Sequence, residues 1–282
     1  MASEQIQKKG GFHYAFLIVA AGIAITCIPC ALVLSCAGIY FTPVSNYFGV
    51  LKASFTLYFS ILNLAMMIML PIGGKLMSKM DARAVLSAAV IIDGLTLIAM
   101  SFFTAVWQFY IAGVLLGIGT APLIYLAVPS LINAWCKKKV GFFIGLCMAF
   151  TGIGGAIWSA VFTALRAGGM DFHTIYLIWA VIALVTSLPF TLLCVRNKPE
   201  DCGLKPYGAA AAAAAAGAST AAVSGLSAKR AMKTPAFYAV CVFAGIINIA
   251  ILIAMQFPTY TKSLVDASFD VAVVGGIMTT VM

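Results

Sequence analysis

The feature that most constrains this chain is a series of long apolar runs. A helix needs about 20 apolar residues to cross the ~30 Å hydrocarbon core of a membrane, and the sequence contains seven such runs with an eighth beginning near its end. None of them alternates with period two, as a membrane β-strand would, and a backbone in lipid must satisfy its own hydrogen bonds. The predicted fold is therefore an all-α, polytopic membrane protein. The approximate spans are 13–41, 54–77, 84–106, 108–135, 140–165, 172–195, 236–261 and 270 onward.

Composition supports a membrane protein, because 63% of the residues are hydrophobic and 9% are charged, against roughly a quarter charged in a soluble domain. The first apolar run follows Lys8 and Lys9 and is longer than the apolar core of a signal peptide. No clear small-residue cleavage site follows it. We therefore expect the first run to be retained as a helix.

The basic residues predict how the chain is oriented. If alternate connections lie on opposite sides of the membrane, Lys52, Arg166 and Lys262 fall on one side and the other 14 of the 17 Lys and Arg residues fall on the opposite side. Positive charge collects on the cytoplasmic side, so the N-terminus is predicted to be cytoplasmic and the protein to lie in the inner or plasma membrane. The net charge of +9 then reports topology and contact with membrane lipid, and not binding to nucleic acid.

Catalytic and cofactor motifs are not found in the sequence. The eight cysteines are scattered singly, and Cys27 and Cys30, although spaced like a redox or zinc motif, lie in an apolar run with no His or carboxylate nearby. We interpret them as small packing residues. Because no nucleophile–base pair, zinc spacing or phosphate loop is present, we predict no enzyme activity, no metal and no cofactor.

One connection is much longer than the others. About forty residues separate Arg196 from Pro235, whereas the other connections have roughly ten or fewer. The predicted domains are a six-helix N-terminal bundle over residues 1–195, a cytoplasmic linker with an alanine tract over 196–235, and an incomplete second bundle over 236–282. Six helices, a long linker and further helices are the layout of transporters built from two repeated halves. The sequence therefore predicts a protein that is truncated after the start of its eighth helix.

The connection between the second and third runs reads GGKLMSKMDAR. It resembles the major facilitator superfamily, whose loop at this place follows the pattern G-x-L-x-D-R-x-G-R. Gly74 and Arg83 match that pattern and Lys79 supplies its basic position, whereas Ser78 replaces the usual acid and Asp81 the second glycine. The resemblance implies that Gly74, Lys79, Asp81 and Arg83 form a gating loop that grips neighbouring helix ends in a state-dependent way.

Four other segments narrow the resemblance to the monocarboxylate-carrier and oxalate:formate-antiporter branch. They occur in the expected order and on the expected sides of the membrane, and they cover the chain from end to end. The resemblance implies a secondary active transporter that moves a small organic anion by alternating access, either by antiport or by symport with protons. The segments are YFTPVSNYFGV, PSLINAWCKKKVGFFIG, RNKPEDCGLKPYG and KTPAFY.

The resemblance also implies a substrate site. In relatives of the oxalate type, aromatic side chains of helices 1, 4 and 5 surround the anion, and basic residues of helices 8 and 11 neutralise it. Alignment places Ser35 at a polar position of helix 1, Tyr125 at the aromatic position of helix 4, Thr151 at that of helix 5 and Asn248 at a polar position of helix 7. Tyr125, Thr151 and Asn248 would orient the carboxylate oxygens. The basic residues would lie beyond Met282.

Other polar and aromatic side chains in the runs are weaker candidates for substrate contact. Each could equally serve packing or lie at the membrane interface; they are Tyr40, Asn63, Trp158 and Gln256. Glycines spaced four apart, at 113 and 117 and at 141 and 145, predict close crossing of helices.

Asp93 lies about ten residues into the third run, near the middle of the membrane. An ionised carboxylate there costs about 2.5–3.5 kcal/mol on insertion scales. Two interpretations remain open: a site that titrates and couples transport to protons, or a protonated or hydrogen-bonded carboxyl between helices.

Two other classes of protein also remain open, a seven-helix receptor and a half-transporter that pairs with another chain.

Overall fold

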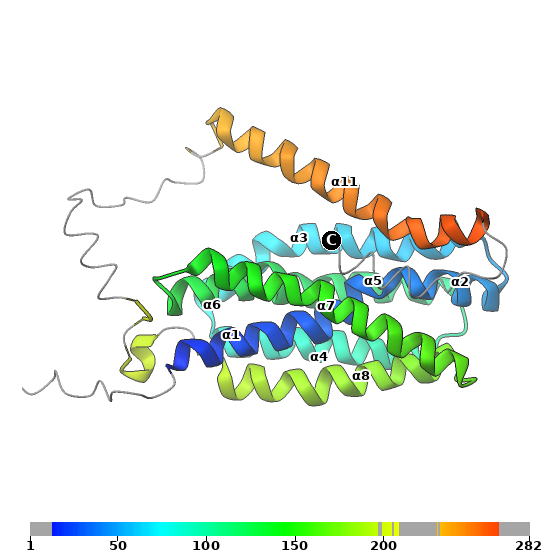
Figure 1. Ribbon diagram of the computed structural model, residues 1–282, viewed down its shortest axis with the longest axis horizontal. Helices are drawn as coiled ribbons and strands as arrows, with labels where there is room; N and C mark the ends of the chain where they lie inside the picture. Colours follow the sequence, from blue (N-terminus) through cyan, green and yellow to red (C-terminus); the bar gives the residue numbers. More distant parts are fainter. Residues whose placement is uncertain (1–12, 197–198, 205, 209–229, 231, 265–282) are drawn as a thin grey trace, which may run out of the picture.

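The computed structural model describes residues 13–196, 199–204, 206–208, 230 and 232–264, with side chains of the last helix described up to Ala250 and at Ile253. The described part of the chain is helical and contains no strand beyond one isolated bridge (Figure 1). Six of its helices are long and apolar enough to cross a membrane. The prediction of an all-α membrane fold is confirmed. The alanine tract and the start of an eighth helix lie outside the described residues.

The six membrane-length helices are numbered here as spans 1 to 6 in chain order. Their bounds are Tyr14–Phe48, Lys52–Lys79, Ala82–Met100, Val106–Trp135, Val140–Ala167 and Phe172–Cys194. Span 1 comprises α1 (Tyr14–Ile25), η1 (Thr26–Ser35) and α2 (Ala37–Phe48), and spans 2 and 3 are α3 and α4. Span 4 comprises α5 (Val106–Ala121), η2 (Pro122–Ala127) and α6 (Val128–Trp135). Span 5 is α7, span 6 comprises α8 (Phe172–Pro189) and η3 (Phe190–Cys194), and η4 (Pro199–Cys202) and α11 (Pro235–Leu264) follow.

Span 1 continues beyond its predicted end at residue 41, as far as Phe48. Pro43 lies inside the helix, where it removes one backbone donor without ending the helix. The helix ends at Gly49, which has the left-handed φ of +63° that glycine adopts at helix C-termini at little cost.

Prolines mark three places where the helices widen into π turns. Pro29 lies inside η1, Pro122 begins η2, and Pro189 directly precedes η3. Because proline has no backbone N–H, one carbonyl of the preceding turn loses its donor, and the hydrogen-bond ladder shifts locally to wider spacing. η1 and η2 contact each other, so the irregular turns of spans 1 and 4 meet inside the bundle.

Glycines bring two pairs of helices close together. A Cβ atom on Gly113 or Gly117 would lie 2.5 Å from a backbone carbonyl oxygen of α3, so the first predicted glycine pair forms a close crossing of spans 2 and 4. Gly141 and Gly145 have nothing within 4 Å among the described residues, and no close crossing forms there. Span 5 instead approaches span 1 at Gly154, where an added Cβ would overlap the Cys27 carbonyl oxygen.

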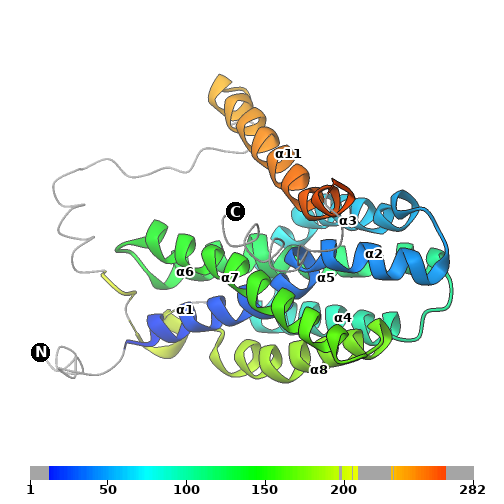
Figure 2. The same cartoon turned by 45° about the vertical axis from the view of Figure 1, so that its right-hand side comes forward.

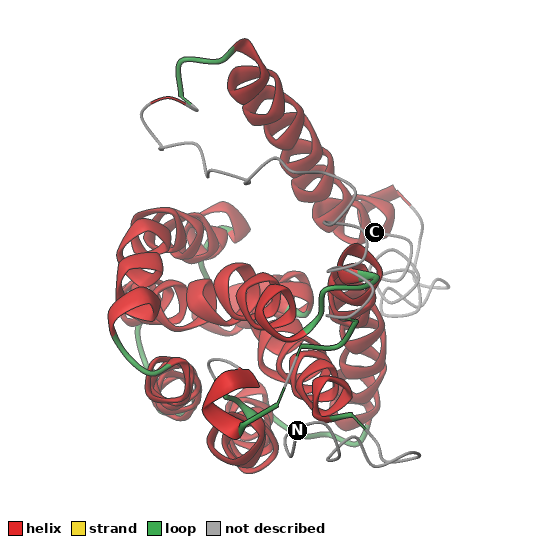
Figure 3. Ribbon diagram, turned by 90° about the vertical axis from the view of Figure 1, so that its left-hand side faces the viewer, coloured by secondary structure: helices red, strands yellow, loops and turns green. Residues whose placement is uncertain are grey.

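The last helix, α11, stands apart from the six-span bundle. Figures 2 and 3 show its first half leaning away from the other helices. α11 contacts the bundle at α2. All described side chains from Pro235 to Ala250 are exposed. The described structure is thus one six-helix bundle with a seventh helix that has no bundle of its own around it.

Candidate functional site

A polar contact between spans 1 and 5 leaves one hydroxyl group without a partner. The Thr26 hydroxyl donates to the Cys147 carbonyl oxygen at 2.8 Å, and the Ser35 hydroxyl donates to the Thr151 carbonyl oxygen at 3.3 Å. A helical threonine usually donates to the carbonyl four residues earlier, which for Thr151 is that of Cys147. Thr26 occupies that carbonyl, and the buried Thr151 Oγ1 has no hydrogen-bond partner in the described part of the chain.

Trp158 and Tyr40 pack inside the bundle. The Trp158 indole N–H donates to the Cys27 carbonyl oxygen at 2.8 Å, which ties span 5 to the π turn of span 1. Its ring lies 5.3 Å from that of Trp179. Tyr40 is 2% exposed and its ring stacks on Tyr176 at 4.4 Å. Both side chains therefore hold spans 1, 5 and 6 together, as the packing interpretation expects.

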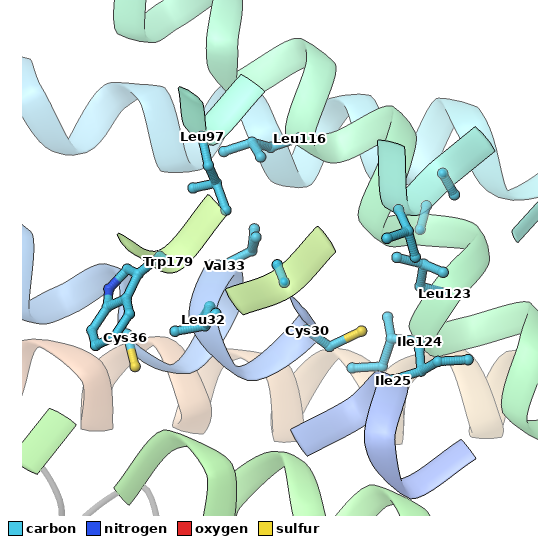
Figure 4. Close-up of a cluster of buried hydrophobic side chains, with 14 of the residues drawn as sticks. Ile25, Cys30, Leu32, Val33, Cys36, Leu97, Leu116, Leu123, Ile124 and Trp179 are labelled. Atoms are coloured by element: carbon cyan, nitrogen blue, oxygen red, sulfur yellow. The ribbon is translucent and has the colours of Figure 1, made fainter. Parts of the chain in front are cut away.

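Tyr125 differs from these two aromatic residues because its side chain is 48% exposed. It lies on η2, between Pro122 and Pro129 of span 4. Figure 4 shows Cys30 of span 1 beside Ile124, the residue before Tyr125. η1 contacts both η2, which carries Tyr125, and α7, which carries Thr151. The two residues therefore lie on elements that flank the π turn of span 1.

Asp93 is completely buried between spans 3 and 4. The Thr120 hydroxyl donates to its Oδ2 at 3.0 Å, while Oδ1 has no partner among the described residues. A Cβ on Gly119 would overlap Oδ1, so the carboxyl lies directly on the backbone of span 4. Elsewhere in the described chain, no three His, Cys, Asp or Glu side chains come together as metal ligands.

The amide candidates lie on exposed helix faces. Asn63 donates to the Phe59 carbonyl oxygen at 2.8 Å and Asn248 donates to that of Ala244 at 2.8 Å, each within its own helix. α11 approaches the bundle at α2, whereas Tyr125 lies on η2. The side chain of Gln256 is outside the described residues. The contacts of Asn248 are thus local to α11 and do not include Tyr125.

The predicted gating loop joins α3 to α4. Gly74 and Lys79 are exposed on the last turns of α3, and Asp81 is the N-cap residue of α4. The Arg83 Nε donates to the Val195 carbonyl oxygen at 2.8 Å, at the end of the neighbouring span 6. The loop therefore contacts the end of span 6 within the same bundle.

Comparison with family models finds a match described as Major Facilitator Superfamily over residues 23–282. The chain belongs to the Major Facilitator Superfamily. Members of this superfamily are membrane transporters, so the chain is a multi-pass membrane protein of a transporter family, and the receptor alternative loses its basis. A search of curated proteins found no significant match.

The end of the bundle at which span 6 finishes carries a cap that the sequence analysis missed. The last carbonyls of a helix have no partner within the helix, and three side chains donate to carbonyls at the end of span 6 and in the two residues that follow it. Besides Arg83, the Tyr14 hydroxyl donates to the Cys194 carbonyl oxygen at 2.8 Å, and the Trp135 indole N–H donates to that of Arg196 at 2.9 Å. Aromatic residues beside basic ones at span ends are the one signal that could have suggested it.

The chain after span 6 also packs against this end of the bundle. Tyr207 exchanges two backbone hydrogen bonds of 2.8 Å with the loop between spans 4 and 5, donating to the Trp135 carbonyl and accepting from the Lys137 N–H. Its ring lies 5.6 Å from His13 and 5.2 Å from Phe16. The first part of the predicted linker thus contacts spans 1, 4 and 5.

Proposed function

We propose that this superfamily member is a secondary active transporter for a small mono- or dicarboxylate, which it moves by alternating access. The observation that carries the proposal is the placement of Tyr125. A phenol that is 48% exposed on a π turn offers a hydrogen-bond donor at membrane depth, and π turns occur often at functional sites. The resemblance to the oxalate-type relatives names the same residue.

The carboxylate would be bound by hydroxyl groups from two sides of η1. A carboxylate oxygen is a strong acceptor, the Tyr125 hydroxyl is a donor, and the Thr151 hydroxyl has no other partner among the described residues. Asn248 on α11 is the candidate from the other half of the transporter. Gln256, Tyr40, Asn63 and Trp158 remain secondary candidates, and the packing of the two aromatic residues favours a supporting role.

The negative charge of the anion requires a cation that spans 1 to 6 do not supply near their middle. Their Lys and Arg residues lie close to the span ends, at positions 52, 75, 79, 83 and 166. We propose that a second six-helix half contributes the cation, as the resemblance implies for helices 8 and 11. The protein would lie in the inner or plasma membrane with its N-terminus in the cytoplasm, following the distribution of basic residues.

A half-transporter that works with a partner chain is the second candidate. The open surface at Gly141 and Gly145, where a Cβ would meet no described residue within 4 Å, favours it because such a small-residue face lets another helix approach closely. Native mass spectrometry of the purified protein distinguishes the two arrangements. A monomer that transports would remove the need for a partner, and a complex of two chains would establish it.

Counterflow in reconstituted vesicles tests the proposal. The full chain is reconstituted into vesicles loaded with unlabelled acetate, lactate, formate or oxalate, and uptake of the same labelled anion is followed. We expect saturable, protein-dependent counterflow with at least one anion. Tyr125→Phe should raise KM roughly tenfold or more, because a hydrogen bond to a charged group is lost. Tyr47→Phe, at an exposed tyrosine near the end of span 1, is the matched control. Absence of counterflow with all four anions would overturn the carboxylate proposal.

A further inference from the structure

We propose that Asp93 is a positioning residue, which fixes the break in span 4 and thereby the place of Tyr125. The inference rests on the proposed function in one respect, namely that Tyr125 contacts the transported anion. It adopts the hydrogen-bonded alternative for Asp93 and extends it, because it gives this buried carboxyl a task in substrate binding without proton coupling.

The contacts of Asp93 with span 4 lie just before the break in that span. Thr120 donates to Oδ2 at 3.0 Å, and Gly119 leaves the space that Oδ1 occupies. α5 ends at Ala121, one residue after Thr120, and Pro122 begins the π turn that carries Tyr125. The carboxyl therefore holds the last residues of α5 against span 3.

The break needs such a contact because its own backbone is weakened. Pro122 provides no N–H to the carbonyl four residues earlier, and a π turn is held less firmly than a regular α-helix. Neighbouring side chains must then determine its direction. The Thr120 hydroxyl joins the turn before the break to Asp93 of α4. The helix α4 contacts both α5 and η2.

The role assigned to Asp93 uses its oxygen as an acceptor and does not use a charge. In the described part of the chain, Asp93 forms no ion pair, and Thr120 is the donor that reaches it. An asparagine has the same shape and retains an acceptor oxygen for Thr120. Replacement by asparagine should therefore preserve the position of Tyr125, whereas replacement by alanine should not.

Kinetic constants of counterflow test the inference with labelled formate or oxalate as the probe. Asp93→Ala is expected to raise KM roughly three- to tenfold with a smaller change in kcat, and Asp93→Asn should leave KM within twofold of the parent. Thr120→Val serves as a second variant should Asp93→Ala fail to fold, and it should resemble Asp93→Ala. Ser87→Ala is the matched control, since Ser87 donates to Thr191 at 3.1 Å in another buried contact of span 3 that does not touch span 4.

A double variant shows whether Asp93 acts through Tyr125. If it does, Asp93→Ala combined with Tyr125→Phe should have the same KM as Tyr125→Phe alone, because coupled residues are not additive. Additive effects would overturn the inference. So would an Asp93→Asn variant that still exchanges anions but no longer accumulates them in response to a pH gradient, since that result would make Asp93 a proton-coupling site.

A labelling experiment tests the inference even if no probe anion is transported. Tyr125→Cys is introduced, the purified protein is treated with N-ethylmaleimide, and modification of the peptide containing position 125 is followed by mass spectrometry. Adding Asp93→Ala should change the labelling rate at least threefold, whereas adding Asp93→Asn or Ser87→Ala should not. Equal rates in all three backgrounds would overturn the positioning role, and a failure of counterflow alone would overturn only the substrate assignment.

Discussion

Replacing Gly154 with alanine should destabilise the bundle at the crossing of spans 1 and 5. An added Cβ would overlap the Cys27 carbonyl oxygen and would lie 2.9 Å from the Ala31 Cβ. Neither neighbour is the flexible end of a side chain, so the two helices must separate. Gly145→Ala is the matched control on the same helix, because its Cβ would meet nothing within 4 Å in the part of the chain that the structure describes.

The difference between the two variants isolates the cost of this overlap. Both substitutions gain roughly 0.5–1 kcal/mol, because alanine is the better helix former. Overpacking of a well-packed interior costs about 1–3 kcal/mol. A shift of roughly 2–4 °C per kcal/mol in a protein of this size class then predicts that Gly154→Ala unfolds about 2–12 °C below Gly145→Ala.

Thermal unfolding in mild detergent measures this difference. A dye that fluoresces on reaction with thiols reports unfolding, because Cys30, Cys36 and Cys147 are buried in the folded bundle. The same preparation supplies the far-ultraviolet circular dichroism that verifies helix content. Equal melting temperatures for Gly154→Ala and Gly145→Ala would contradict the close crossing and the assignment of η1 to the interface with span 5.

Three further predictions concern the cap, the segment after span 6 and the free hydroxyl. Trp135→Phe removes the donor to the Arg196 carbonyl and should lower stability by about 0.5–1.5 kcal/mol in the same melting assay. Tyr207→Ala removes the ring contacts with His13 and span 1 and should speed tryptic cleavage between span 6 and α11 severalfold, whereas Tyr207→Phe should not. Thr26→Val frees the Cys147 carbonyl oxygen, so that the Thr151 hydroxyl can donate to it and is no longer available to the anion. The variant should therefore raise KM for the anion, as Thr151→Val does. An unchanged KM would remove Thr151 from the site.

The six-helix bundle could be predicted from the sequence because the apolar runs are the physical cause of the fold. A run of about 20 apolar residues has one stable form in lipid, so each span was found near its observed place. The end of span 1 was harder to predict. Pro43 looks like a helix stop in sequence, whereas the backbone there tolerates it and continues to the left-handed Gly49.

The contacts between helices could be predicted only in part. Glycine spacing identified the crossing at Gly113 and Gly117, but the same spacing at Gly141 and Gly145 has no described neighbour, and Gly154 forms the crossing instead. The spacing of glycines indicates a helix face made of small residues, but it does not indicate which helix packs against that face. The cap of span 6 joins Tyr14 to a carbonyl 180 positions away in the sequence, and no local pattern encodes such a pair.

The candidate site, too, could be predicted from the sequence only in part. Tyr125 was identified from a resemblance, and its exposure on a π turn fits that role. The availability of the Thr151 hydroxyl depends on Thr26, a residue of another span that takes the neighbouring carbonyl. That relationship exists only after spans 1 and 5 have packed together, so sequence spacing could not reveal it.

The most direct test of the account asks whether Tyr125 faces a route for the anion. Tyr125→Cys is placed in vesicles of known orientation, and a membrane-impermeant maleimide is added from either side. Alternating access predicts that position 125 is modified from both sides, and that a transported anion slows the reaction from each. Modification from neither side would place Tyr125 against lipid and would contradict the central claim.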